Sequence, residues 1–211
     1  MLFRSLVHQI LTSPGIDFAK KKDRETRDKP PYSRERNRGW KEPHPQAYWA
    51  KLNPKERRSV LIVQEHLPHY RVPFFQRLRD ELSSHQVCLR LVFSPQGSQS
   101  HLPGTLPWAE PVPIRWCGPL GWQNVLPLAR GVSLVVAPQE SKYAVLPVLL
   151  FLRRWKGWKF AFWGHGRNFQ AVHPHGPAEL WKRFLSRRAD WWFAYNALSA
   201  QAVRQLGFPD A

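Results

Sequence analysis

Short apolar runs alternate with segments of helical periodicity over most of the chain. Runs rich in Val, Ile, Leu, Phe and Trp are typical of buried strands, whereas apolar residues three or four positions apart indicate helices. Strands are predicted at Ser59–Gln64, Val87–Phe93, Leu134–Ala137, Lys159–Trp163 and Asp190–Tyr195. Helices are predicted at Tyr70–Ser83, Ser141–Arg154, Pro177–Arg188 and Leu198–Leu206. Within the irregular segment Ser94–Asn124, Val112–Trp116 is a further candidate strand.

This alternation predicts an α/β fold with a Rossmann-like parallel sheet and helices on both faces. The preceding segment Thr12–Arg58 has few apolar residues and several prolines. We therefore expect a disordered basic leader over residues 1–58 and one domain over residues 59–211. The first residues, MLFRSLVHQIL, are apolar and basic without a following small-residue cleavage site, and a weak amphipathic helix is the alternative there.

Composition narrows the possible partners and the compartment. The formal net charge is +17, shared between the leader and the rest of the chain, and it favours anionic partners such as nucleic acid, phosphate-bearing substrates or anionic membrane. Two cysteines, Cys88 and Cys117, are too few for a disulfide framework and indicate a reducing compartment such as the cytosol. The longest apolar stretch, Tyr143–Leu152, is too short to span a bilayer.

The most distinctive segment is Lys159–Gln170, KFAFWGHGRNFQ, in which a predicted strand stops at Gly164-His165-Gly166. Two glycines allow a sharp turn and a close approach of the backbone to a ligand. Ligands of open α/β sheets bind just beyond the carboxyl ends of strands, and a histidine there can exchange protons near neutral pH. His165 is therefore a candidate catalytic residue, and Arg167 and Asn168 are candidate ligand contacts. The alternative is a turn whose side chains only stabilise the backbone.

Other candidates lie after neighbouring strands. His66 and His69 fall in the loop after the first strand, and Arg71 lies where an anion could meet a helix N-terminus. Glu140 follows the strand Leu134–Ala137. For each of these residues, a solvated loop position or a surface ion pair is the alternative. His173 and His175 have no third ligand at a suitable spacing, so no metal site is expected.

Three stretches carry a resemblance to a known family. These are VLIVQEHLPHYRVPFFQRLRDEL, FAFWGHGRN and RRADWWFAYNALSAQAVRQLGFP. Over about Ser59–Ala211 they resemble the N-terminal, acceptor-side domain of GT-B glycosyltransferases of the family 4 type. In such proteins a strand-end histidine faces the cleft between two Rossmann-like domains, and His165 matches it. Where many members have a Gly-Gly loop after the first strand, this chain reads EHLPHY.

The resemblance implies transfer of a sugar from a nucleotide sugar to a polysaccharide or lipid-linked acceptor, without a metal or other cofactor. The family's donor domain, with its basic residues and paired glutamates, does not follow Ala211, so we expect a truncated enzyme that does not transfer sugar alone. The alternative function is a non-catalytic basic module on the same fold that binds nucleic acid or anionic membrane. Signatures of nucleic-acid recognition are absent from the sequence, so no nucleic acid partner is expected.

The predicted helix Pro177–Arg188 bears on where the protein acts. It is amphipathic and carries Lys182, Arg183, Arg187 and Arg188. Basic amphipathic helices favour contact with membrane surfaces. We therefore expect a cytoplasmic protein with peripheral contact to the cytoplasmic face of the membrane.

Overall fold

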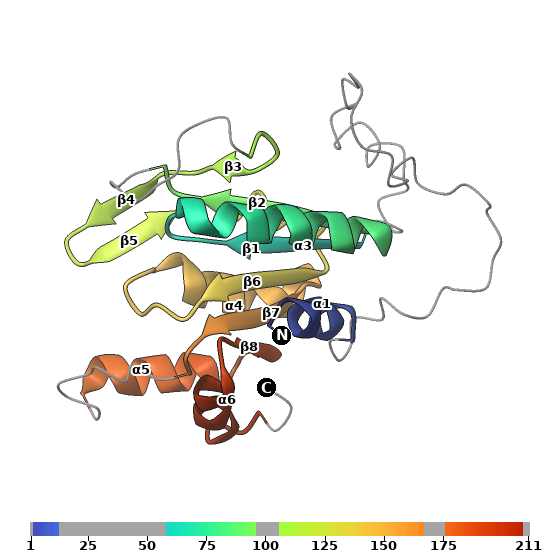
Figure 1. Cartoon of the computed structure of the whole chain (residues 1–211). Coiled ribbons are helices and arrows are strands. Elements are labelled where there is room, and N and C mark those ends of the chain that lie inside the picture. Colours follow the sequence, from blue (N-terminus) through green and yellow to red (C-terminus); the bar gives the residue numbers. More distant parts are fainter. Residues whose placement is uncertain (1, 13–57, 96–105, 167–175, 209–211) are drawn as a thin grey trace, which may run out of the picture.

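The computed structural model describes residues 2–12, 58–95, 106–166 and 176–208 of the chain. It contains a six-stranded sheet with the order β3-β2-β1-β6-β7-β8, in which every neighbouring pair is parallel (Figure 1). These strands are β1 (Arg58–Val63), β2 (Val87–Phe93), β3 (Glu110–Pro111), β6 (Leu134–Pro138), β7 (Lys159–Gly164) and β8 (Trp191–Ala194). The predicted α/β, Rossmann-like fold is thereby confirmed.

Helices connect and cover these strands. They are α1 (Leu2–Thr12), α3 (Val72–Ser84), α4 (Val145–Lys156), α5 (Pro177–Ser186) and α6 (Ala197–Arg204), with a short 3₁₀ turn, η1 (His69–Arg71). Figure 1 shows α3 across one face of the sheet and α4 behind the other. Among the described residues, no helix has the length and apolar character that crossing a bilayer requires.

Alternating residues of the central strands feed two apolar cores. Val60 and Ile62 of β1 belong to the core beneath α3, whereas Leu61 and Val63 belong to the core beneath α4. Val60 pairs with Leu89 of β2 and with Leu134 of β6, so neighbouring strands present matching side chains to the same face. Strands that are buried on both sides consist of continuous apolar runs, and for this reason the central strands could be predicted from the sequence.

The N-terminal residues correct the predicted leader. Leu2–Thr12 form α1, and its side chains Leu6, Val7 and Ile10 are buried in the same core as Phe75 and Leu78 of α3. The expected disorder from residue 1 therefore does not apply to residues 2–12, where the alternative of an amphipathic helix holds. The remainder of the predicted leader, residues 13–57, lies outside the described residues.

The segment between β2 and β6 contains more regular structure than predicted. Ile114–Cys117 (β4) and Leu120–Gln123 (β5) form an antiparallel hairpin, whereas only one strand, Val112–Trp116, was expected. The backbone of Gly121 then pairs with Lys142 and Ala144, at N–O distances of 2.8 and 3.0 Å. This pairing holds residues 141–144 out of the predicted helix, so α4 begins at Val145. Pro147 therefore falls in the first helical turn, where its missing N–H costs no hydrogen bond.

Asp190 joins the elements at the β8 edge of the sheet. Its carboxylate accepts a hydrogen bond from the backbone N–H of Phe160 in β7 at 2.8 Å and from Arg153 in α4 at 3.2 Å. Lys159 lies 3.8 Å from the same carboxylate. Asp190 therefore fixes the end of α4 against the beginnings of β7 and β8.

Candidate functional site

Because the strands are parallel, the carboxyl ends of β1, β6, β7 and β8 lie at the same end of the sheet. From β1 the chain winds outward through β2 to β3, and then returns beside β1 to wind the other way through β6, β7 and β8. In such sheets ligands bind at the carboxyl ends of the strands, near the point where the winding reverses. The residues after β1, β6, β7 and β8 are the ones that this rule selects.

His165 lies at these carboxyl ends, immediately after β7, and it is exposed. Its Nδ1 shares a hydrogen bond of 2.8 Å with the Ser199 hydroxyl, and its ring centroid lies 4.7 Å from that of Tyr195. Ser199 is fully buried in α6, and its backbone N–H donates to the side chain of Asn196, which caps the helix. The position of the imidazole is thus set by the N-terminal turn of α6.

Arg71 connects the end of β1 with the end of β8. Its guanidinium donates to the Gln64 side chain at 3.1 Å and to the Tyr195 hydroxyl at 3.5 Å. It also lies over the rings of Trp163 and Tyr195, at 5.9 and 5.7 Å from their centroids. Such a cation–π arrangement holds the positive charge of Arg71 at the strand ends. The salt bridges of the described residues do not include Arg71, so the alternative of a surface ion pair is not seen there, whereas the anion contact stays a prediction.

These residues form one group, which we call the strand-end cluster. Trp163 is buried and Tyr195 is half-buried, and their rings lie 5.6 Å apart. The aromatic rings therefore form a floor, with a cation and an imidazole held against them. The cluster consists of Gln64, Arg71, Trp163, His165, Tyr195 and Ser199.

A second polar group lies at the adjacent ends of β1 and β6. The Lys142 ammonium contacts both oxygens of Glu65, at 3.0 and 3.1 Å, and lies over the rings of Trp116 and Tyr143. Partial burial would raise the pKa of Glu65, but the Tyr143 hydroxyl and the Lys142 ammonium outweigh that effect and lower the pKa below its usual value. Burial, and then the negative charge of Glu65, raise the pKa of Tyr143, so this tyrosine stays protonated.

The loop after β1 places the two predicted histidines differently. His66 Nδ1 lies 4.0 Å from a Glu65 oxygen and belongs to this second group. His69 is exposed in η1 and packs edge-on against Tyr70, at 5.8 Å between centroids. Glu140 is also exposed, and its negative charge contributes to the raised pKa of Tyr143. Of these predicted contacts, none joins the strand-end cluster.

The two glycines beside His165 have different structural roles. A side chain at Gly164 would meet Gln139 at an ordinary distance of 3.5 Å. Gly166 has a φ of +78°, and a Cβ there would lie 2.7 Å from Val203 Cγ2 in α6. Its carbonyl accepts a hydrogen bond from the buried side chain of Gln139 at 3.2 Å. Gly166 therefore lets the chain after β7 lie against α6, whereas Arg167 and Asn168 lie outside the described residues.

Several residues of the site were not predicted from the sequence. Tyr195 ends a predicted strand on the same edge of the sheet, so its position after β8 was an available signal. Ser199 and Lys142 fell inside predicted helices, and nothing in their spacing points to His165 or Glu65. Their roles follow from the packing of α6 on β8 and from the pairing of Gly121 with residues 142 and 144.

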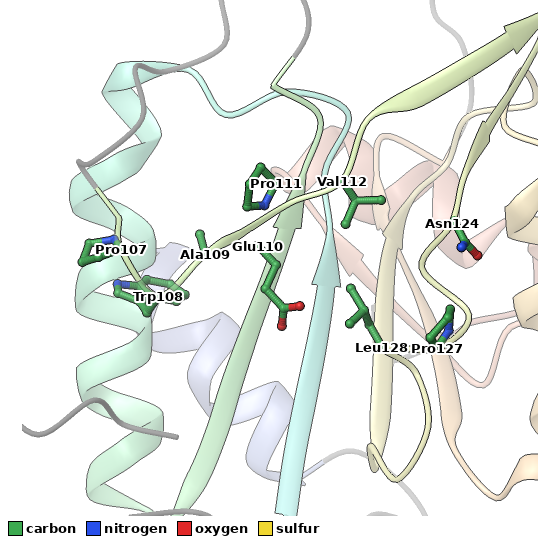
Figure 2. A pocket seen from close by; sticks show the side chains of 9 residues that line it. All are labelled: Pro107, Trp108, Ala109, Glu110, Pro111, Val112, Asn124, Pro127 and Leu128. Carbon is green, nitrogen blue, oxygen red and sulfur yellow. The ribbon is translucent and has the colours of Figure 1, made fainter. Parts of the chain in front are cut away.

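A pocket elsewhere in the molecule has a different character. It is open, has a volume of about 430 Å³ and lies beside β3, at the opposite edge of the sheet from β8. Figure 2 shows the Glu110 side chain between Trp108 on one side and Leu128 on the other. Because Arg90 already binds the Glu110 carboxylate at 2.9 Å, the pocket offers little polar binding capacity. We therefore place the candidate site at the strand-end cluster.

The described part of the chain shows no group of side chains that could bind a metal ion. There, three or more His, Cys, Asp or Glu side chains are nowhere grouped so that they could hold a metal ion. His173 and His175 lie outside that part.

Comparisons of the chain with known protein families, with curated proteins and with solved structures found no match. What the chain does must therefore be inferred from the strand-end cluster and from the sequence resemblance.

Proposed function

We propose that this chain is the acceptor-side domain of a GT-B glycosyltransferase of the family 4 type. In this proposal it binds a polysaccharide or lipid-linked acceptor at the strand-end cluster, and a second domain holds the nucleotide sugar. The observation that carries the proposal is the exposed imidazole of His165 after β7, held by Ser199 at 2.8 Å. Its place in the chain is the one that the sequence resemblance gives to the cleft-facing histidine.

The chemistry of the cluster suits a sugar. The half-buried ring of Tyr195 can pack against the apolar face of a sugar while the buried Trp163 supports it from below, and Tyr195 and Arg71 add hydrogen-bond donors. A positioned imidazole can accept a hydrogen bond or a proton from an attacking hydroxyl group. Holding that hydroxyl beside the anomeric carbon supplies the positioning part of catalysis.

The positive charge of Arg71 suits the nucleotide-sugar donor. Departure of a nucleoside diphosphate develops negative charge, which a nearby cation stabilises. Arg71 is held at the same edge as His165 through the ring of Tyr195, which both residues contact. In the proposed enzyme, Arg71 faces the donor phosphates across the cleft while His165 faces the acceptor.

Replacement of His165 by alanine tests the proposal. In a glycosyltransferase that contains this domain, turnover should fall by roughly 10²-fold, as for loss of a positioned acid–base group. Ser199→Ala should give a smaller loss, because the imidazole remains but is no longer held. Turnover is measured as release of nucleoside diphosphate over a panel of nucleotide sugars and acceptors.

The matched control is His85→Ala, which removes an exposed histidine at the opposite end of the strands, just before β2 begins. This variant should retain full turnover. The isolated 211-residue chain supplies a second readout, since saturation-transfer NMR detects weak binding of oligosaccharides. An acceptor signal that His165→Ala leaves unchanged, together with unchanged turnover, would show that His165 is only a turn residue.

A further inference from the structure

Helix α5 leaves most of its apolar side exposed. Leu180, Trp181 and Phe184 are 54%, 42% and 40% exposed, whereas Leu185, one turn after Trp181 on the same side, and Ser186 are buried. The rings of Trp181 and Phe184 stack with their centroids 5.4 Å apart. An amphipathic helix on a globular domain ordinarily directs its apolar stripe to the core. In α5 the larger apolar side chains remain in contact with solvent.

Helix α4 contacts the end of α5 through Arg153. Its side chain donates to the backbone carbonyl of Arg188, and the Arg188 guanidinium lies 3.4 Å from the ring centroid of Phe184. Phe151 and Trp155 of α4 are 42% and 75% exposed, but they lie on the side of the helix opposite to Arg153, because residues two positions apart do not share a helix face. We therefore call Leu180, Trp181 and Phe184 of α5 the aromatic surface.

Positive charge surrounds the aromatic surface. Exposed basic side chains lie on both helices and just after α5; they are Arg154, Lys156, Arg183, Arg187 and Arg188. Asp190, which lies between the two helices, is already paired with Arg153 and Lys159. The surface is therefore apolar at its centre and cationic at its border.

We propose that the aromatic surface binds an anionic lipid bilayer, with α5 lying in the plane of the headgroups. Tryptophan and phenylalanine side chains are stable at the boundary between headgroups and acyl chains, and arginines beside them attract acidic lipids. The pattern of exposed rings bordered by cations fits such a boundary, since one side of it is apolar and the other anionic. The proposal does not depend on glycosyl transfer, because it involves neither His165 nor Arg71.

Vesicle co-sedimentation with the full chain tests this proposal. The chain should bind vesicles containing phosphatidylserine more tightly than vesicles of phosphatidylcholine alone, and salt should weaken the binding. Trp181→Ser/Phe184→Ser should weaken it by about tenfold or more, because burial of two aromatic side chains is lost. Arg183→Glu/Arg187→Glu should weaken it similarly on the acidic vesicles alone.

Two controls separate this surface from the general charge of the chain. Trp116→Ser removes another exposed tryptophan, on the β4–β5 hairpin, and Arg115→Glu/Arg130→Glu makes the same change in net charge elsewhere. Both should bind like the unmodified chain. Circular dichroism verifies that each variant is folded.

Several outcomes would overturn the proposal. One is absence of binding to acidic vesicles by the unmodified chain. Another is binding that the α5 variants and the controls weaken equally, which would assign the effect to net charge. A dimer in solution that Trp181→Ser/Phe184→Ser dissociates would show that a second copy covers the aromatic surface.

Discussion

Gly166 shows how one residue places the candidate site. Its φ of +78° lies in the left-handed region, and the space that a side chain would occupy is filled by Val203 of α6. Because α6 carries Ser199, the approach that Gly166 permits also brings the serine hydroxyl to His165. The absence of a side chain at Gly166 is therefore one reason why His165 is held by Ser199.

Gly166→Ala should therefore destabilise the domain through both strain and overpacking. The left-handed conformation costs roughly 1 kcal/mol for alanine, and the contact with Val203 adds about 1–3 kcal/mol. Gly131→Ala is the matched control, since Gly131 has a φ of +73° but nothing within 4 Å of its Cβ position. Urea unfolding measures both variants. Equal losses for the two would mean that α6 moves aside without cost.

Glu65 should make stability depend on pH. Its pKa is lowered in the folded chain, so the stabilisation is present above the unfolded-state pKa, about 4.3, and disappears as pH falls through the folded-state pKa. Glu65→Gln should reduce the free energy of unfolding near pH 7, and this difference should shrink in acid. Glu81→Gln, at an exposed position on α3, is the control. A difference that stays constant down to about pH 2 would rule out the Lys142–Glu65 pair as its source.

At the scale of elements, α1 is the least expected part of the fold. It is separated in sequence from the sheet by residues 13–57, yet Leu6, Val7 and Ile10 complete the core over α3. A helix of this length is marginal alone in water, so its stability depends on this packing. The folded unit therefore begins at α1, before the first strand.

Ile10→Ala tests whether α1 is an integral element. The side chain is fully buried, and its truncation should cost about 2–4 kcal/mol in the free energy of unfolding. His8→Ala changes an exposed position of the same helix and should cost little. The two variants are compared by urea unfolding at neutral pH. If Ile10→Ala is as stable as His8→Ala, α1 does not contribute to the core.

At the scale of the whole molecule, the central strands of the sheet are more buried than the strands at its periphery. β1 and β6 lie in the middle and are buried on both faces, whereas β3 pairs through two residues only and β4 of the β4–β5 hairpin is largely exposed. Opening free energies rise from such margins towards the centre of a domain. The candidate site lies at the carboxyl ends of β1, β7 and β8, where Trp163 belongs to the core and His165 is exposed.

Hydrogen exchange should reproduce this gradient. Amides of β1 and β6 should exchange only through global unfolding, with opening free energies equal to the free energy of unfolding. Amides of the β4–β5 hairpin should exchange through local opening, with lower protection. Mass spectrometry or NMR of the full chain supplies the measurement. Protection of the hairpin equal to that of β1 would contradict a graded domain and indicate one cooperative unit.

The sequence by itself determined five of the six strands of the sheet and the kind of fold. Strands buried on both faces must be continuously apolar, so β1, β2, β6 and β7 were visible as runs, and their alternation with helices predicted a parallel sheet. The position of His165 followed as well, because Gly164 and Gly166 mark the end of an apolar run. All of these signals are local in the chain.

Only the tertiary structure decided which side chains meet at the strand ends. His165 and Ser199 are separated by 34 positions, and Arg71 and Tyr195 by 124, so no sequence period relates them. Their contacts arise because parallel strands place distant loops at one edge of the sheet. The same holds for α1, whose docking partner is set by the core that it completes, and for α5, whose apolar stripe was readable but whose outward direction was not. A periodic pattern fixes the sides of a helix, whereas packing fixes which side meets water.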